Sequence, residues 1–199
     1  MPRILCQHCH RPQLSCICQF VTKVKNTILV VVLQHPNEVK QSKGTLTLLA
    51  NSLQNCVVIV DEDFTHNQAL NDVLAKYQQN TLLLYPQDDA QTIESMKKTM
   101  NNNGEKYCLI LIDATWKKAY RMYMLSKNLH SITKLQLPTG YRSLYKIRKT
   151  TVTNGLSTLE ACCYALSDLE KEPEKYQKLL SNFVGFNEFL LSFRKTKAQ

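Results

Sequence analysis

Four cysteines near the start of the chain have the type and the spacing of metal ligands. Cys6 and Cys9 form a C-x-x-C pair, and a C-x-C pair at Cys16 and Cys18 follows after six residues. Two tight loops that present four thiolates can close a tetrahedron around Zn²⁺, and four soft ligands leave no open position for catalysis. We therefore predict a structural zinc site with these four ligands. A pair of reversible disulfides and a disordered segment are the alternatives.

Asp113 provides a carboxylate where a strand is expected to end. It follows the apolar run 107–112 and precedes the segment 116–125, whose apolar residues recur at helical spacing. Ligands bind beyond the carboxyl ends of parallel strands, so Asp113 is a candidate catalytic group, and an N-cap of the next helix is the alternative. The apolar side of that helix is expected to pack in the core. It consists of Trp116, the sole tryptophan, and Ala119, Tyr120, Tyr123 and Met124.

Polar and aromatic segments follow the other expected strands. Segment 34–45 is a turn-rich loop with one imidazole, one carboxylate and two ammonium groups, and Tyr85 with Pro86 offers one wall of an aromatic pocket. Segment 138–149 holds two tyrosines among two arginines and two lysines. Aromatic rings interleaved with cations suit stacked bases and phosphates. A solvated basic loop is the alternative.

The elements that must position these residues alternate along the chain. Runs of β-branched and apolar residues predict buried strands at 27–33, 56–60, 81–85, 107–112 and 133–137. Helical spacing predicts helices at 44–53, 67–77, 88–100, 116–125, 157–170 and 174–194, the last as one helix or as two broken near Gly185. The alternation predicts an α/β fold with a mostly parallel sheet and helices on both faces. Ser157 and Glu160 match the capping box that begins a helix.

The composition narrows the class of protein. The 199 residues include 25 Lys and Arg and 16 Asp and Glu, a formal net charge of +9. Such a charge favours a polyanionic partner, most often nucleic acid, and a basic protein without such a partner is the alternative. The longest apolar run, 28–33, is far shorter than the roughly 18 residues of a membrane span, and no secretory signal is recognisable. We therefore expect a cytoplasmic protein, with a zinc knuckle at 1–24 and one catalytic domain at 25–199.

Several motifs occur together in a fixed order. They are C-x-x-C-x-R-P and C-x-C from residue 6, LQHPNEV from 33, KGT from 43, LYP from 84, DATW from 113, YRSLYKIRK from 141 and LSTLEA from 156. In this order and spacing, over about residues 5–170, they resemble the DTW-domain family of tRNA-uridine aminocarboxypropyltransferases. The resemblance implies a fold related to the SPOUT class, with a trefoil knot in the C-terminal part of the sheet.

The resemblance also implies a reaction. The 3-amino-3-carboxypropyl group of S-adenosylmethionine would pass to N3 of a tRNA uridine, and methylthioadenosine would leave. N3 carries a proton and lies on the pairing edge of the base, so the base must be turned out and the proton accepted. Asp113 matches the first residue of the family signature, and we expect it to be the proton acceptor or else a group that orients the base or the cofactor's amino group.

The remaining site residues follow from the family motifs and from the strand ends. The expected cofactor-binding residues are Tyr85, Pro86, Thr115, Trp116, Leu137, Pro138, Gly140, Ser157 and Thr158. The expected RNA-binding residues are His35, Lys43, Lys117, Arg121, Arg142, Tyr145, Arg148 and Lys149. The partner is expected to be tRNA, with no membrane contact, and a monomer is favoured.

Two other functions compete with this one. A SPOUT-type RNA methyltransferase would use the same cofactor, and a non-catalytic zinc-dependent RNA-binding module would need no cofactor. Ribosomal RNA is an alternative substrate, and iron is an alternative metal for the cysteines.

Overall fold

The computed structural model describes residues 4–41, 44–100, 105–141, 143–144 and 155–195. A six-stranded sheet lies at its centre, with the strand order β2-β1-β5-β3-β6-β4, and every neighbouring pair is parallel. The strands are β1 (Leu29–Gln34), β2 (Cys56–Val60), β3 (Thr81–Leu84), β4 (Gln91–Thr92), β5 (Cys108–Asp113) and β6 (Thr133–Gln136). The expected parallel α/β fold is confirmed, and the short edge strand β4 adds to the five predicted strands.

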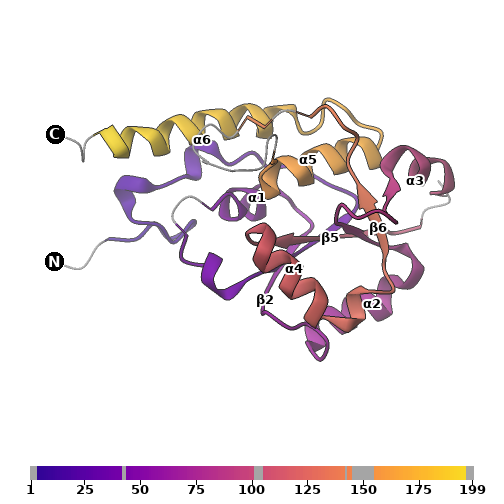
Figure 1. The fold of residues 1–199 in the computed structure, drawn as a ribbon. Helices are drawn as coiled ribbons and strands as arrows, with labels where there is room; N and C mark the ends of the chain where they lie inside the picture. The colour runs from indigo at the N-terminus through magenta and orange to yellow at the C-terminus, as the bar shows by residue number, and fades with distance from the viewer. Residues whose placement is uncertain (1–3, 42–43, 101–104, 142, 145–154, 196–199) are drawn as a thin grey trace.

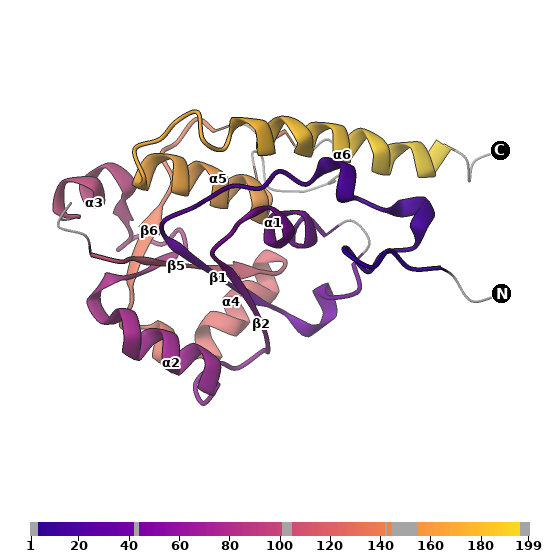
Figure 2. The same ribbon diagram turned by 180° about the vertical axis from the view of Figure 1, so that it is seen from behind.

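Helices cover both faces of the sheet (Figure 1). They are α1 (Leu46–Ser52), α2 (Gln68–Tyr77), α3 (Ile93–Thr99), α4 (Trp116–Leu125), α5 (Thr158–Leu169) and α6 (Gln177–Lys195). Figures 1 and 2 show α1, α5 and α6 on one face and α2 and α4 on the other. Successive strand residues point to opposite faces, so Val30 and Val32 pack with the first group while Val31 and Leu33 pack with the second.

Helix α6 runs without a break through Gly185. A Cβ atom at Gly185 would lie 3.4 Å from the ring of Phe20 in the N-terminal segment. The same ring contacts Phe186 edge-on and lies against Phe189, with centroid separations of 6.1 and 5.5 Å. The Phe20 ring therefore packs against α6 around Gly185, and of the two predicted forms of this region the single helix is confirmed.

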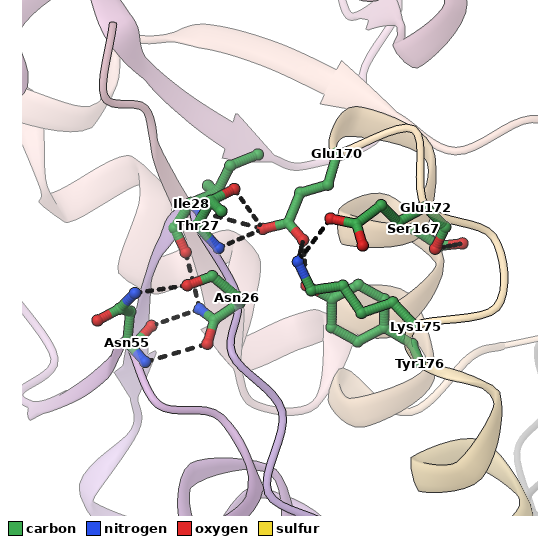
Figure 3. Close-up of polar contacts among 9 residues, drawn as sticks. All are labelled: Asn26, Thr27, Ile28, Asn55, Ser167, Glu170, Glu172, Lys175 and Tyr176. Carbon is green, nitrogen blue, oxygen red and sulfur yellow. Dashed lines mark hydrogen bonds and ion pairs between the residues drawn. The ribbon is translucent and has the colours of Figure 1, made fainter. Parts of the chain in front are cut away.

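A buried carboxylate fastens the amino end of β1 to the connection between α5 and α6 (Figure 3). Oε1 of Glu170 accepts hydrogen bonds from the backbone N–H groups of Thr27 and Ile28 at 2.7 and 3.1 Å. Oε2 accepts from the Tyr176 hydroxyl and pairs with Lys175, both at 2.7 Å. This network lies at the amino end of β1, whereas Asp113 lies at the carboxyl end of β5.

A membrane span, the trefoil knot and the division into domains concern the chain as a whole. Among the helices of the described residues, none is both long enough and apolar enough to cross a bilayer. The trefoil knot stays a prediction, because part of the connection between β6 and α5 (142 and 145–154) lies outside the described residues. The division of the chain near residue 24 also stays a prediction.

Candidate active site and metal centre

A cavity of about 400 Å³ opens at the carboxyl ends of β3, β5 and β6. Its volume lies within the range of about 300–1,000 Å³ that is typical of small-molecule sites. The first turns of α4 and α5 form part of its wall through Trp116 and Thr158. The cavity therefore occupies the place where parallel sheets bind ligands.

Most of the predicted cofactor-binding residues meet at this cavity. Those that line it are Tyr85, Pro86, Trp116, Leu137, Ser157 and Thr158. Thr115, Pro138 and Gly140 are not among the lining residues, although their neighbours Ala114 and Thr139 are. Residues outside the predicted cofactor-binding set complete the wall, and they are Leu84, Leu111, Ile112, Ala119, Leu135, Gln136, Gly155, Leu156 and Ala161. The role of the predicted set in binding a cofactor stays a prediction.

Asp113 ends β5 beside this cavity. Its Oδ1 accepts a hydrogen bond from the Thr158 hydroxyl at 2.6 Å, and its Oδ2 accepts one from the Gln34 side-chain amide at 3.0 Å. The N-cap position of α4 belongs to Thr115, so the alternative role of Asp113 as that N-cap is wrong. Both donors are neutral, and no cationic side chain among the described residues forms an ion pair with Asp113. These two hydrogen bonds therefore orient the carboxylate without neutralising its charge.

Gln34 was not recognised as a site residue from the sequence. It is paired with Asp113 in the parallel register of β1 and β5, which places the amide next to the carboxylate. The only sequence signal was an amide directly after an apolar strand. That signal becomes informative only when the strand order is known, because the two residues are 79 positions apart.

Two of the predicted RNA-binding residues near β1 and α4 are connected by one acidic side chain. His35 is largely buried, with Nδ1 accepting from the backbone N–H of Asn37 at 3.1 Å and Nε2 lying 3.5 Å from Glu62 Oε1. The same oxygen of Glu62 pairs with Arg121 Nε at 2.9 Å. Lys117 is exposed and forms no ion pair with any described residue. Lys43, Arg142, Tyr145, Arg148 and Lys149 lie outside the described residues.

The start of the basic segment is fastened to α5. Tyr141 stacks on Tyr164 with a centroid separation of 4.2 Å, and its hydroxyl donates to Asp168 at 3.1 Å. Burial, together with the charge of Asp168, raises the pKa of Tyr141 to about 12. The Ser143 hydroxyl and the Leu144 backbone N–H donate to the carboxylate of Glu160.

Glu160 thus has two structural roles. It completes the predicted capping box with Ser157, which the structure confirms. The Ser157 N–H donates to its carboxylate at 2.7 Å, and the side chain is fully buried. The same carboxylate holds the segment at 143–144, so the sequence motif LSTLEA does more than begin a helix.

Trp116 does not pack in the core as expected. It is 51% exposed, and Tyr120 and Met124 on the same side of α4 are also exposed. The buried face of α4 consists of Ala119, Met122 and Tyr123. The apolar face of α4 is wider than the part that packs against the sheet. Periodicity alone does not tell which part of that face is buried.

The four N-terminal cysteines converge as predicted. Their Sγ atoms all lie within 4.8 Å of one another, with Cys6 and Cys18 at 3.6 Å and Cys9 and Cys16 at 3.8 Å. Four sulfurs bonded to Zn²⁺ at about 2.3 Å in a tetrahedron would be separated by about 3.8 Å, so this donor set fits zinc. All four thiols are free, which rules out the alternative of paired disulfides in this structure. Cys9 also packs in the main core, which is against disorder of the segment.

Comparison with known proteins decides the family. The profile of the DTW domain matches residues 3–191. The chain belongs to the DTW domain family. Within this DTW domain, the cavity, Asp113 and the cysteine cluster all fall inside the matched region.

Three similar proteins have the same name. The chain is 34% identical over 182 residues to tRNA-uridine aminocarboxypropyltransferase 2 of Drosophila melanogaster, covering 88% of this chain and 70% of that protein. It is 31% identical to the proteins of the same name from Mus musculus and Macaca fascicularis, covering 83% and 94% of this chain. The DTW domain described here spans only 56% and 63% of those two relatives. No solved structure matches the chain at a significant level.

Proposed function

We propose that this DTW domain protein is a tRNA-uridine aminocarboxypropyltransferase that uses S-adenosylmethionine as the group donor. The observation that carries the proposal is the cavity at the carboxyl edge of the sheet, because the motifs LYP, DATW and LSTLEA converge on it. The names of the relatives support the same reaction. We expect the protein to act on tRNA, in the cytoplasm and as a monomer.

The cavity has the properties that this donor requires. Its wall is mostly apolar, which suits the adenine ring of the donor. The amino ends of α4 and α5 face it through Trp116 and Thr158. N–H groups at the start of a helix favour an anionic partner, such as the carboxylate of the transferred group.

The reaction needs a positioned nucleophile and a proton acceptor. S-adenosylmethionine supplies a sulfonium, and when uridine N3 bonds to the methylene carbon of its aminocarboxypropyl arm, the carbon–sulfur bond breaks and its electron pair stays on sulfur. Gln34 and Thr158 hold the two carboxylate oxygens of Asp113, and Thr158 also lines the cavity. We assign Asp113 to accept the N3 proton, and a role in orienting the base or the donor's amino group is the alternative.

The experiment that tests the proposal uses two labelled donors. Purified protein is incubated with an unmodified tRNA transcript and S-adenosylmethionine that carries ¹⁴C either in its carboxyl or in its methyl group. Transfer of the carboxyl label alone supports the proposal. Transfer of the methyl label alone would identify a methyltransferase, and retention of tRNA with neither transfer would identify an RNA-binding module.

A further inference from the structure

Three exposed apolar side chains form a ridge on α4. Trp116, Tyr120 and Met124 are 51%, 59% and 49% exposed. They recur every four residues, so they lie one above the other on the same side of the helix. Large aromatic side chains on a surface typically mark a place of contact.

Cations lie along one side of this ridge. Helix α4 carries Lys117, Lys118 and Arg121 and no acidic residue. Lys118 is fixed by Glu38 at 2.8 Å, and Arg121 is fixed by Glu62 while 67% of its side chain stays exposed. Lys117 is exposed, and none of the carboxylates in the described ranges pairs with it. An anionic partner therefore finds positive charges beside the apolar ridge.

The ridge is continuous with the candidate active site. Trp116 belongs to both, because it lines the cavity and is half exposed at its mouth. A chain that enters the cavity with one residue can therefore lay the next residue on α4. Bases have an apolar π-face and phosphates carry the charge, so an unpaired RNA strand matches both features of this surface.

We propose that the ridge of Trp116, Tyr120 and Met124 binds the unpaired bases next to the target uridine, with their phosphates along Lys117 and Arg121. This inference rests on the proposed function, since it names the part of the RNA that the same site holds. The occupant is a single-stranded loop of the substrate RNA. A paired stem does not fit, because its bases are stacked on one another.

The sole tryptophan makes the proposal directly measurable. A base that stacks on the Trp116 indole quenches its fluorescence, and no other tryptophan contributes to the signal. The intact zinc-loaded protein is titrated with an unmodified tRNA transcript, with a single-stranded oligouridylate and with a fully paired RNA duplex. We expect saturable quenching by the first two and little by the duplex.

Variants of Tyr120 provide the second readout. Tyr120→Ala is expected to weaken the binding of tRNA at least five-fold, because stacking on an aromatic side chain stabilises each bound base substantially. Tyr120→Phe keeps the ring and is the matched control, with affinity close to wild type. The affinity for S-adenosylmethionine should stay unchanged in both variants, since Tyr120 does not line the cavity.

Several results would overturn the inference. If the protein retains and modifies tRNA without a change in Trp116 emission, the proposed role of the ridge is wrong and the proposed function stands. The same conclusion follows if Tyr120→Ala binds tRNA with full affinity. Quenching by S-adenosylmethionine but not by RNA would assign Trp116 to the donor pocket only. A dimer that Tyr120→Ala abolishes would reassign the ridge to a second copy of this chain. Failure to retain any tRNA would instead contradict the proposed function together with this inference.

Discussion

At the scale of single residues, the Asp113 carboxylate is held between a glutamine of one strand and a threonine of one helix. Gln34 and Thr158 donate to its two oxygens, at 3.0 and 2.6 Å. Both are uncharged donors that fix the orientation of the carboxylate without neutralising it. This arrangement favours a group that accepts a proton or attracts a cationic ligand at a defined position.

We predict that Asp113→Asn lowers the rate of group transfer at least 100-fold, because a general base typically contributes a factor of 10²–10⁴. Binding of tRNA and of S-adenosylmethionine should change only a few-fold. Single-turnover rates and equilibrium binding measure the two effects separately. Asp72→Asn on the exposed side of α2 is the control, and a full transfer rate in Asp113→Asn would remove the base role.

Glu160 is the second residue whose removal should have a specific effect. We predict that Glu160→Gln destabilises the fold by about 1–3 kcal/mol, because an amide cannot accept from all the N–H and O–H groups that surround this buried side chain. Urea denaturation measures the change. The substitution of the exposed Glu174 by glutamine is the control and should change the stability by no more than about 0.5 kcal/mol. Equal stability of the two variants would contradict the assignment.

At the scale of elements, the connection between α5 and α6 depends on ionised Glu170 (Figure 3). Burial acts to raise the pKa of Glu170, but hydrogen bonds from Lys175, from Tyr176 and from the backbone of β1 outweigh it and hold the pKa below its ordinary value. A carboxyl group with a lowered pKa in the folded state stabilises the protein above its unfolded pKa of about 4.3. That stability is lost as the pH falls further, through the lowered pKa.

The prediction is that the free energy of unfolding decreases as the pH is lowered below about 4.3, and that Glu170→Gln removes part of this dependence. At neutral pH the substitution should cost about 3 kcal/mol, because it leaves the charge of the mostly buried Lys175 side chain with a weaker partner. Glu172→Gln removes the other, exposed partner of Lys175 and serves as the matched control. Identical pH profiles for the two variants would contradict this account.

The sequence predicted the regular elements well because their patterns are local. Five of the six strands lie within two residues of their expected ranges at both ends, and α4 has its predicted bounds. Strand β4 was missed because Gln91 and Thr92 have no apolar pattern and pair only at the edge of the sheet. Helix α3 starts at Ile93 rather than near Asp88, because Thr92 caps it.

The candidate site was predicted where it depended on motifs and missed where it depended on topology. Asp113, Ser157 and Thr158 come together as expected. The contact of Gln34 with Asp113 requires β1 and β5 to be neighbours, and strand order is not visible in local patterns. The exposure of Trp116 was also missed, because it depends on how α4 is rotated against the sheet.

At the scale of the whole molecule, the cysteine cluster joins the N-terminal segment to the main core. Cys9 and Ile17 pack with residues of the sheet and of α6, and Phe20 contacts two phenylalanines of α6. A metal at the four sulfurs would therefore stabilise this packing as well as the knuckle itself. We expect the zinc knuckle to contribute to the binding of tRNA at a place outside the reaction centre.

We predict one bound zinc per chain, measured by metal analysis of the purified protein. Cys16→Ser should release the metal and lower the stability or the affinity for tRNA more than the affinity for S-adenosylmethionine. Cys56→Ser, outside the cluster, should keep the metal. If the analysis finds iron in place of zinc, the identity of the metal changes but the four ligands stay the same. If Cys16→Ser lowers only the affinity for S-adenosylmethionine, the structural role of the metal is contradicted.

The most direct test of the central claim is nucleoside mass spectrometry of tRNA after incubation with the protein and S-adenosylmethionine. The account predicts a uridine that is heavier by one aminocarboxypropyl group, formed in equal amount to the methylthioadenosine that is released. Unchanged tRNA, or a methylated nucleoside formed together with S-adenosylhomocysteine, would contradict it.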